Sequence, residues 1–356
     1  GAIPAQLGAL NSVTQLDLSD NQLSGLIPPE LGNLGALTSL NLAGNKLSGR
    51  IPEELGKLTA LRELSLHFNQ LSGLIPPELG NLGALTTLDL GTNKLSGAIP
   101  AQLSALKNVT WLDLSDNQLS GPIPPEFGNL EGLTTLDLSA NKLSGRIPEE
   151  LGKLTALRKL SLQYNQLSGP IPKELGDLAE LKKLELFINN LMGTIPPELG
   201  NLTALQELYL HQNGLSALWD HTQDAHGVGN EERANSKSGG AVPRHLSRLL
   251  DVLDRCNELL LDGNPWTEPP ESIVIKGGTG IRGYFEDLYA EPCRIQRNSV
   301  KIILVGQEGA GKTSLRQSMK ANKAAPTGEW EKESTVFADV EPMELEGASV
   351  RVYDCA

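Results

Sequence analysis

The sequence predicts an α/β fold in two parts, a solenoid of about ten 24-residue repeats followed by the first part of a second α/β domain. Three observations lead to this prediction. An asparagine recurs every 24 residues, a Leu-x-Leu pair precedes each asparagine, and a strongly apolar run at 300–305 leads into a glycine-rich segment. Because stacked repeats bury a core that no single repeat could bury, the first part should fold as one array. The recurring residues are Asn21, Asn45, Asn69, Asn93, Asn117, Asn141, Asn165, Asn189 and Asn213.

Each repeat has two recognisable halves. The first reads Leu-x-Leu-x-x-Asn, and the second reads Leu-Ser-Gly-x-Ile-Pro in most copies. Leu-x-Leu places both leucines on one side of a short strand, and the asparagine can donate and accept hydrogen bonds in the turn that follows. Proline restricts the returning segment to extended or early-helical geometry. The pattern resembles the leucine-rich repeat, and its second half resembles the plant-type subclass.

The repeat register continues after an interruption. Asn264 follows Asn213 by 51 residues, which is one 24-residue period plus 27, and the leucines before Asn264 keep the offsets of the first repeat. We expect the extra residues, within 217–243, to form a mobile polar loop at the edge of the solenoid, with a badly joined coding segment as the alternative. The repeats are therefore assigned to residues 1–216 and the insertion to residues 217–245.

The last repeat and a C-terminal cap are assigned to residues 246–296. After Trp266 the repeat pattern stops, and apolar residues then recur at helical spacing. A solenoid needs such a cap over the exposed end of its core. The residues expected to face that core are Ile281, Tyr284, Phe285 and Leu288.

The residues between and just after the strand leucines should point to the concave face. Most are Asp, Ser, Thr or small residues, and aromatic residues make up only 4% of the chain. Several large side chains on an otherwise polar face, spread over about 29 Å at a strand spacing of about 4.8 Å, favour a protein- or peptide-binding strip. The alternative is a set of scattered surface aromatics with no partner. The strip comprises His67, Phe68, Trp111, Tyr164, Phe187, Ile188, Tyr209 and His211.

Composition excludes several classes of function. The formal net charge of −13 disfavours binding to a phosphate backbone, so we expect no nucleic-acid partner. The longest apolar run is too short to cross a bilayer, so no membrane span is expected. Three cysteines without metal-ligand spacing, Cys256, Cys293 and Cys355, favour reduced thiols in a cytoplasmic protein.

Two further features bear on where the protein works. Glycosylation-type tripeptides begin at Asn108 and Asn201, and for a cytoplasmic protein we interpret them as coincidental. No signal peptide is visible, but the chain opens within a repeat, so we expect it to be a fragment.

A phosphate-binding motif follows the apolar run. The residues match G-x-x-x-x-G-K-[ST], with a strand pattern before them and a helix pattern at 314–320 after them. The glycines let backbone N–H groups turn toward phosphate oxygens, Lys312 would reach the β- and γ-phosphates, and the Thr313 hydroxyl would hold Mg²⁺. The phosphate-binding residues are Gly306, Gln307, Glu308, Gly309, Ala310, Gly311, Lys312 and Thr313.

Residues 350–356 alternate in polarity and include Asp354, and they resemble the start of the D-x-x-G element of small GTPases. The resemblance implies that Asp354 stands on the Mg²⁺ side of the nucleotide. Thr335 lies where a switch threonine would contact Mg²⁺ and the γ-phosphate, although a solvent-facing loop threonine is an equal alternative. Residues 297–356 are therefore interpreted as the N-terminal part of a truncated P-loop NTPase domain.

Plant-type repeats, a cap, a phosphate loop and the start of D-x-x-G together resemble the Roco family. In that family leucine-rich repeats precede a Roc GTPase domain and a COR dimerisation domain, and some members add a kinase. The resemblance implies a regulatory GTP-binding protein that uses Mg²⁺ and GTP or GDP, with a repeat arm for an unknown protein or peptide. The guanine-reading N-K-x-D element is not present, so guanine selectivity and GTP hydrolysis are implied by the family alone.

Two other functions stay open. The chain could be a pure protein-binding module, such as a receptor ectodomain, in which the phosphate motif is accidental. It could also be a P-loop ATPase with leucine-rich repeats, but such chains usually place the nucleotide domain before the repeats. They also carry a second acidic residue where Cys355 follows Asp354 here.

Overall fold

The computed structural model describes residues 1–218, 242, 244–267, 269–289, 299–305, 342–345 and 348–355. Side chains are described up to residue 287, except those of Arg244 and His245. The chain divides into two compact units, one formed by Gly1–Ala234 with Val242–Asp287 and the other by Asn235–Ala241 with Leu288–Ala356. The two units are described separately below.

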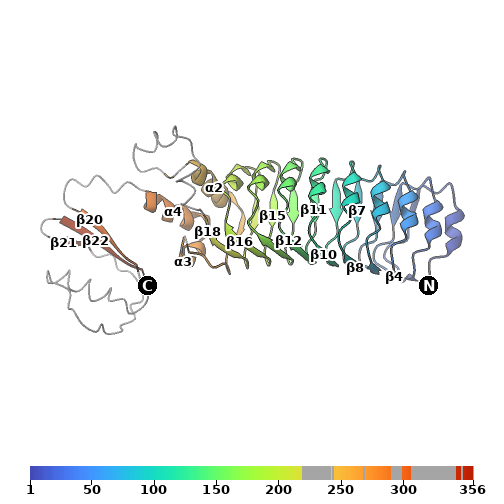
Figure 1. The fold of residues 1–356 in the computed structure, drawn as a ribbon, viewed down its shortest axis with the longest axis horizontal. Coiled ribbons are helices and arrows are strands. Elements are labelled where there is room, and N and C mark those ends of the chain that lie inside the picture. The colour runs from blue at the N-terminus through green and yellow to red at the C-terminus, as the bar shows by residue number, and fades with distance from the viewer. Residues whose placement is uncertain are drawn as a thin grey trace. The chain divides into compact units, whose positions relative to one another are not determined.

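The first unit contains the predicted parallel sheet of ten strands (Figure 1), which confirms the solenoid prediction. Neighbouring strands pair in register at an offset of one repeat, so that Leu16 stands beside Leu40 and Leu40 beside Leu64. The strands are β1 (Gln15–Asp17), β3 (Ser39–Asn41), β5 (Glu63–Ser65), β7 (Thr87–Asp89), β9 (Trp111–Asp113), β11 (Thr135–Asp137), β13 (Lys159–Ser161), β15 (Lys183–Glu185), β17 (Glu207–Tyr209) and β19 (Glu258–Leu260).

A second parallel sheet of nine short strands is formed by the second half of each of the first nine repeats. In the first eight of these repeats the glycine of this half has φ between 79° and 87°, a left-handed conformation that side chains with a Cβ rarely adopt. The strands are β2 (Ser24–Gly25), β4 (Lys46–Gly49), β6 (Gln70–Gly73), β8 (Lys94–Gly97), β10 (Gln118–Gly121), β12 (Lys142–Gly145), β14 (Gln166–Gly169), β16 (Asn190–Thr194) and β18 (Gly214–Ala217).

A short 3-10 helix connects the two sheets in each repeat. The proline before it is extended, as at Pro28 with φ −66° and ψ 130°, and the helix begins directly afterwards. These helices are η1 (Ala5–Ala9), η2 (Pro29–Asn33), η3 (Glu53–Lys57), η4 (Pro77–Asn81), η5 (Ala101–Ala105), η6 (Pro125–Asn129), η7 (Glu149–Lys153), η8 (Lys173–Asp177) and η9 (Pro197–Asn201). Leucines from all three segments are fully buried between the sheets, for example Leu31, Leu40 and Leu47.

The tenth repeat is built differently from the others. An α-helix, α2 (Arg244–Arg255), takes the place of the 3-10 helix and packs against η9 through buried Leu246, Leu249 and Leu250. β19 still pairs with β17 in the predicted register, with Leu259 beside Leu208. The ninth repeat extends further than predicted, because Ala217 belongs to β18 and Leu218 is fully buried. Most of the interruption at 217–243 lies outside the described residues.

Two helices lie where the sequence predicts a cap. These are α3 (Glu271–Val274) and α4 (Gly277–Tyr289), which follow the last repeat, and Ile281 and Phe285 of α4 are fully buried. Arg282 links α4 to α2 through ion pairs with Asp251, at 2.7 Å, and with Asp254. The side chain of Leu288, also predicted to face the core, lies outside the described residues.

The second unit is described only by its sheet of three strands, β20 (Ser299–Val305), β21 (Pro342–Leu345) and β22 (Ala348–Cys355). β20 and β22 are parallel, and Leu304 stands beside Asp354. β21 runs antiparallel on the other side of β22. In the described part of the chain, no helix combines the length and apolarity that crossing a bilayer would require.

Candidate functional site

Strand geometry separates a buried face from an open face in the ten-stranded sheet. The leucines of each Leu-x-Leu point into the core, so the residues that flank them point the other way. We call this side, which the sequence predicts to be concave, the open face. It carries three columns of side chains, because each strand position stacks on the same position of the next repeat.

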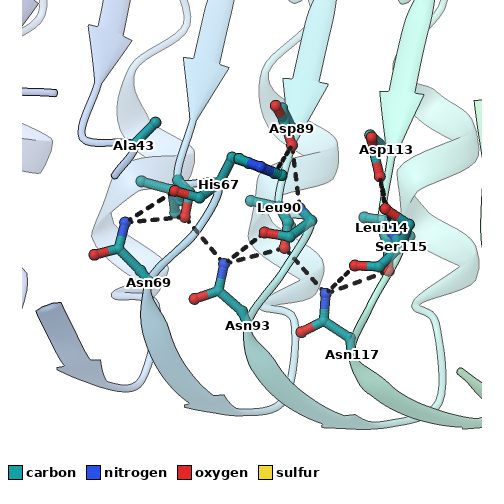
Figure 2. Close-up of polar contacts among 12 residues, drawn as sticks. Ala43, His67, Asn69, Asp89, Leu90, Asn93, Asp113, Leu114, Ser115 and Asn117 are labelled. Atoms are coloured by element: carbon teal, nitrogen blue, oxygen red, sulfur yellow. Dashed lines mark hydrogen bonds and ion pairs between the residues drawn. The ribbon is translucent and has the colours of Figure 1, made fainter. Parts of the chain in front are cut away.

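The asparagine ladder fixes where each strand ends and where its open-face residues stand (Figure 2). Asn117 is a representative member and is almost fully buried. Its Nδ2 donates to the carbonyl oxygens of Leu90, Leu114 and Ser115 at 3.0, 3.3 and 3.0 Å, while its Oδ1 accepts from the Leu95 N–H at 2.9 Å. One side chain therefore ties its own turn to both sheets of the preceding repeat.

The residue before each ladder asparagine has a left-handed backbone. Phe68, Tyr164 and Ile188 have φ of 51°, 56° and 51°. For β-branched Ile188 this conformation is strained. Phe68 and Tyr164 have exposed fractions of 61% and 51%, and Trp111, on β9, has 43%. These three side chains are thus outside the core, as predicted.

An aromatic cluster occupies the C-terminal part of the open face. Phe187 is stacked on His211, with ring centroids 4.3 Å apart and ring planes 13° apart. Tyr164 meets Phe187 edge-on at 5.2 Å, and Tyr209 meets it edge-on at 6.2 Å. Burial lowers the pKa of His211, so its imidazole is neutral at neutral pH. We call Tyr164, Phe187, Tyr209 and His211 the aromatic cluster.

Tyr209 departs from the prediction in its exposure. Its exposed fraction is 8%, because its hydroxyl donates to Glu258 of the next strand and to Glu207, the latter at 3.2 Å. These bonds, the one to Glu258 first, raise the pKa of Tyr209 above its ordinary value. Tyr209 therefore supports the base of the cluster and offers little surface of its own.

The predicted strip is divided in two. His67 and Phe68 form a separate N-terminal group with ring centroids 6.3 Å apart, and Trp111 lies between this group and the aromatic cluster. The space between them is acidic. Asp89 and Asp113 stand beside each other on β7 and β9, and His67 Nδ1 lies 3.4 Å from Asp89 Oδ1 (Figure 2).

The two carboxylates are held by their own turns. Asp89 accepts from the Gly91 N–H at 3.1 Å, and Asp113 accepts from the N–H and hydroxyl of Ser115 at 2.8 and 2.6 Å. Burial raises the pKa of both groups above the ordinary value, and repulsion adds to this, from Asp113 for Asp89 and from Asp137 for Asp113. We call Asp89 and Asp113 the acidic pair.

Sequence reasoning missed the acidic pair, although the recurring Asp in Leu-Asp-Leu was a visible signal. It treated these residues as polar background, because their burial and repulsion follow only from stacking. A metal site is not indicated, since no group of three potential His, Cys, Asp or Glu ligands occurs among the described residues.

The predicted nucleotide site falls mostly on residues that the structure does not describe. Gly306 to Thr313 and Thr335 lie outside the described residues, and only the position of Asp354 in β22 is described. Parallel strands present their carboxyl ends at the same edge of a sheet, so the end of β20 and Asp354 lie at one edge. Gly306 follows β20 directly in the sequence.

Comparison with known proteins identifies the repeats. Leucine-rich-repeat models match residues 59–119 and 124–167, with single-repeat matches at residues 12–34, 36–58 and 180–202. These segments are leucine-rich repeats, as their pattern predicted.

The solved structures that resemble this chain include two plant receptors. The plant peptide hormone receptor RGFR1, in complex with RGF2, has 32% sequence identity and a TM-score of 0.64, over 74% of this chain and 42% of the receptor chain. The Arabidopsis receptor kinase HAESA, in complex with the peptide hormone IDA and the co-receptor SERK1, has 34% identity and a TM-score of 0.62, over 74% of this chain and 40% of that chain.

One curated relative comes from another group of organisms. The probable serine/threonine-protein kinase pats1 of Dictyostelium discoideum is 37% identical over 87 residues, which is 23% of this chain and 3% of the kinase. This chain thus spans about two fifths of the receptor chains and a small part of the kinase.

Proposed function

We propose that this leucine-rich-repeat chain is a protein-binding module that holds an extended peptide on the open face of its ten-stranded sheet. The aromatic cluster, with exposed Phe68 and Trp111 beside it, is the observation that carries the proposal. Rigid aromatic side chains supply large contact area at low entropic cost, and they dominate many protein interfaces. The likeness to two receptor structures solved with bound peptide hormones supports the same function.

A displayed library of random dodecapeptides tests this proposal on the full chain. The wild-type protein should retain a defined set of peptides, and the triple variant Phe68→Ala, Trp111→Ala and Tyr164→Ala should lose them while keeping its unfolding transition. The control is the pair Leu26→Ala and Leu74→Ala, which removes equally exposed apolar side chains next to the nine-stranded sheet. Equal retention by the folded triple variant and the wild type would refute the proposal.

We also propose a second function, nucleotide binding at residues 306–313, as expected for a regulatory GTP-binding protein of the Roco type in the cytoplasm. The sequence match and the parallel pairing of β20 with β22 support it, because that pairing aligns Asp354 with the strand that enters the motif. Lys312 would contact the β- and γ-phosphates, and Thr313, Thr335 and Asp354 would hold Mg²⁺ with GTP as the ligand.

Titration of the 356-residue chain with fluorescent GTP and ATP tests this second proposal. The chain contains no Asn-Lys-x-Asp sequence to read guanine. We therefore expect weak, Mg²⁺-dependent binding without base preference and without hydrolysis, and Lys312→Ala should abolish it. Tight GTP-selective binding would contradict the expectation that the chain does not distinguish guanine from adenine. Nucleotide binding that Lys312→Ala leaves unchanged would show that residues 306–313 are not the binding site.

A further inference from the structure

Within the described residues, no lysine or arginine forms an ion pair with Asp89 or Asp113 of the acidic pair. The basic side chain near Asp89 is the imidazole of His67. Next along the same column, Asp137 has a partner, because Lys159 Nζ lies 3.0 Å from its Oδ2. A partly buried carboxylate without a counter-charge is unfavourable, so the acidic pair would be stabilised by a cation from outside.

Charges next to the aromatic cluster are already paired. Lys183 Nζ lies 2.8 Å from Glu207 Oε2 and 3.3 Å from Glu185 Oε1, and it also stands 5.2 Å from the ring centroid of Tyr209. This pairing lowers the pKa of Glu207 and raises that of Lys183, so both stay charged and mutually neutralised near neutral pH. The cluster therefore offers ring surface to a partner, while its lysine is already shared between two glutamates.

Two hydrogen-bonding atoms beside Phe187 are unused. Gln163 Oε1 and His211 Nδ1 are shielded from solvent and have no hydrogen-bond partner in the described part of the chain. They belong to the repeats on either side of Phe187, at the position directly after the second strand leucine. Because solvent does not reach either atom, a ligand at this point of the open face would contact the rings and not these two groups.

We propose that the peptide held on the open face carries a basic residue against Asp89 and Asp113 and an apolar or aromatic residue against Phe187 and Tyr164. This inference rests on the proposed peptide-binding function. It adds the register of the ligand, that is, which strands its basic and its apolar residue contact. β9 and β15 are three strands apart and β7 and β15 four, which at about 4.8 Å per strand gives about 14 to 19 Å. An extended chain covers that distance in about four to six residues at about 3.3 Å each.

The charge of the molecule favours this occupant over a second copy of the chain. A net charge of −13 repels another copy but attracts a basic peptide over a long range. Trp111 is exposed on the same strand and the same face as Asp113, so an arginine or lysine held by the carboxylates would have an indole ring nearby for a cation–π contact. The acidic pair and Trp111 thus select one side chain, and the aromatic cluster selects the other.

The full chain and peptides from the dodecapeptide selection provide the test. Retained peptides should carry Lys or Arg four to six positions from an aromatic or large aliphatic residue. In calorimetry, replacing that Arg by its neutral isostere citrulline should weaken binding at least tenfold. The double variant Asp89→Asn with Asp113→Asn should weaken the Arg peptide similarly and bind the Arg and citrulline peptides about equally. Asp17→Asn is the matched control, because Asp17 occupies the same column and accepts from Ser19 in the same way.

The two proposals fail in different ways. If retained peptides depend on Trp111 and Tyr164 but lack a basic residue at this spacing, the proposed position of the basic residue is wrong, while peptide binding on the open face is still supported. The same conclusion follows if the citrulline exchange has an equal effect on wild type and double variant, since the cation would then bind elsewhere. If no retained peptide depends on the open face, both proposals are wrong.

Discussion

Replacing Asn117 by alanine tests the asparagine ladder as the element that joins one repeat to the next. The three carbonyl oxygens that Asn117 contacts each keep a second donor, namely Asn93 Nδ2 for Leu90, Asn141 Nδ2 for Leu114 and the Thr92 N–H for Ser115. The Leu95 N–H differs, because Asn117 Oδ1 is its hydrogen-bond partner and Leu95 is fully buried. The loss is therefore concentrated on one orphaned donor.

The magnitude follows from these contacts. An orphaned buried N–H costs about 1–3 kcal/mol, and the two lost side-chain N–H bonds add about 0.5–1.5 kcal/mol each, so Asn117→Ala should cost about 2–6 kcal/mol. Asn21 is the matched control. It is exposed and donates only within its own turn, to Leu18 and Ser19, so Asn21→Ala should cost less than about 1 kcal/mol.

Urea unfolding followed by circular dichroism would compare the two variants, and hydrogen exchange would follow the amide of Leu95. In Asn117→Ala that amide should lose protection, while amides three or more repeats away should change little, because repeats are coupled mainly to their neighbours. Equal losses of stability in the two variants, or an unchanged Leu95 amide, would show that the ladder does not work through this donor.

Three further outcomes are expected. Burial raises the pKa of Asp89 and Asp113 above 3.8, so these two carboxylates bind protons more readily in the folded state than in the unfolded state. The ionisable side chains beside them are His67 and Asp137. The contribution of Asp89 and Asp113 to stability is therefore greatest at acid pH and is lost as the pH rises through the raised values. The free energy of unfolding of the wild type should accordingly fall relative to that of the double variant Asp89→Asn with Asp113→Asn as the pH rises through this range, and a rise relative to the variant would show that the pKa shifts have the opposite sign. Burial also raises the pKa of Cys256 to about 11, so its alkylation at pH 8 should be slow until the protein unfolds, and fast labelling of the folded chain would count against this. Replacing residues 219–241 by a short Gly-Ser linker should shift Tm by no more than a few degrees, since β17 and β19 pair without them and loop length contributes little; a large loss would show that the segment supports the fold.

Periodicity predicted the first sheet and its register because both depend on local pattern. The nine-stranded sheet was missed because Leu-Ser-Gly is also a turn signal. Neighbouring strands of this sheet are also very short, and β2 and β4 pair through only two residues of each strand. The helix α2 was missed although Leu246, Leu249, Leu250 and Leu253 follow helical spacing, because the same leucines also fit the repeat pattern. The burial of Tyr209 could not be predicted, because its partner Glu258 is 49 residues away and becomes adjacent only when β19 joins the sheet.

Two near-identical repeats show how the open face varies independently of the fold. Residues 50–73 and residues 146–169 differ at three of 24 positions, where Glu63, His67 and Phe68 are replaced by Lys159, Gln163 and Tyr164.

All three differences lie on the open face, while every leucine, the ladder asparagine and the Leu-Ser-Gly half are the same. The core and ladder can stay constant because the ladder bonds at these positions use backbone atoms and not the side chains that differ. The exchanges place a histidine beside Asp89 in one copy and a lysine beside Asp137 in the other. A face that differs in charge along an otherwise uniform scaffold is what recognition of an asymmetric peptide in one register requires, because a uniform face would bind such a peptide equally well one repeat further along.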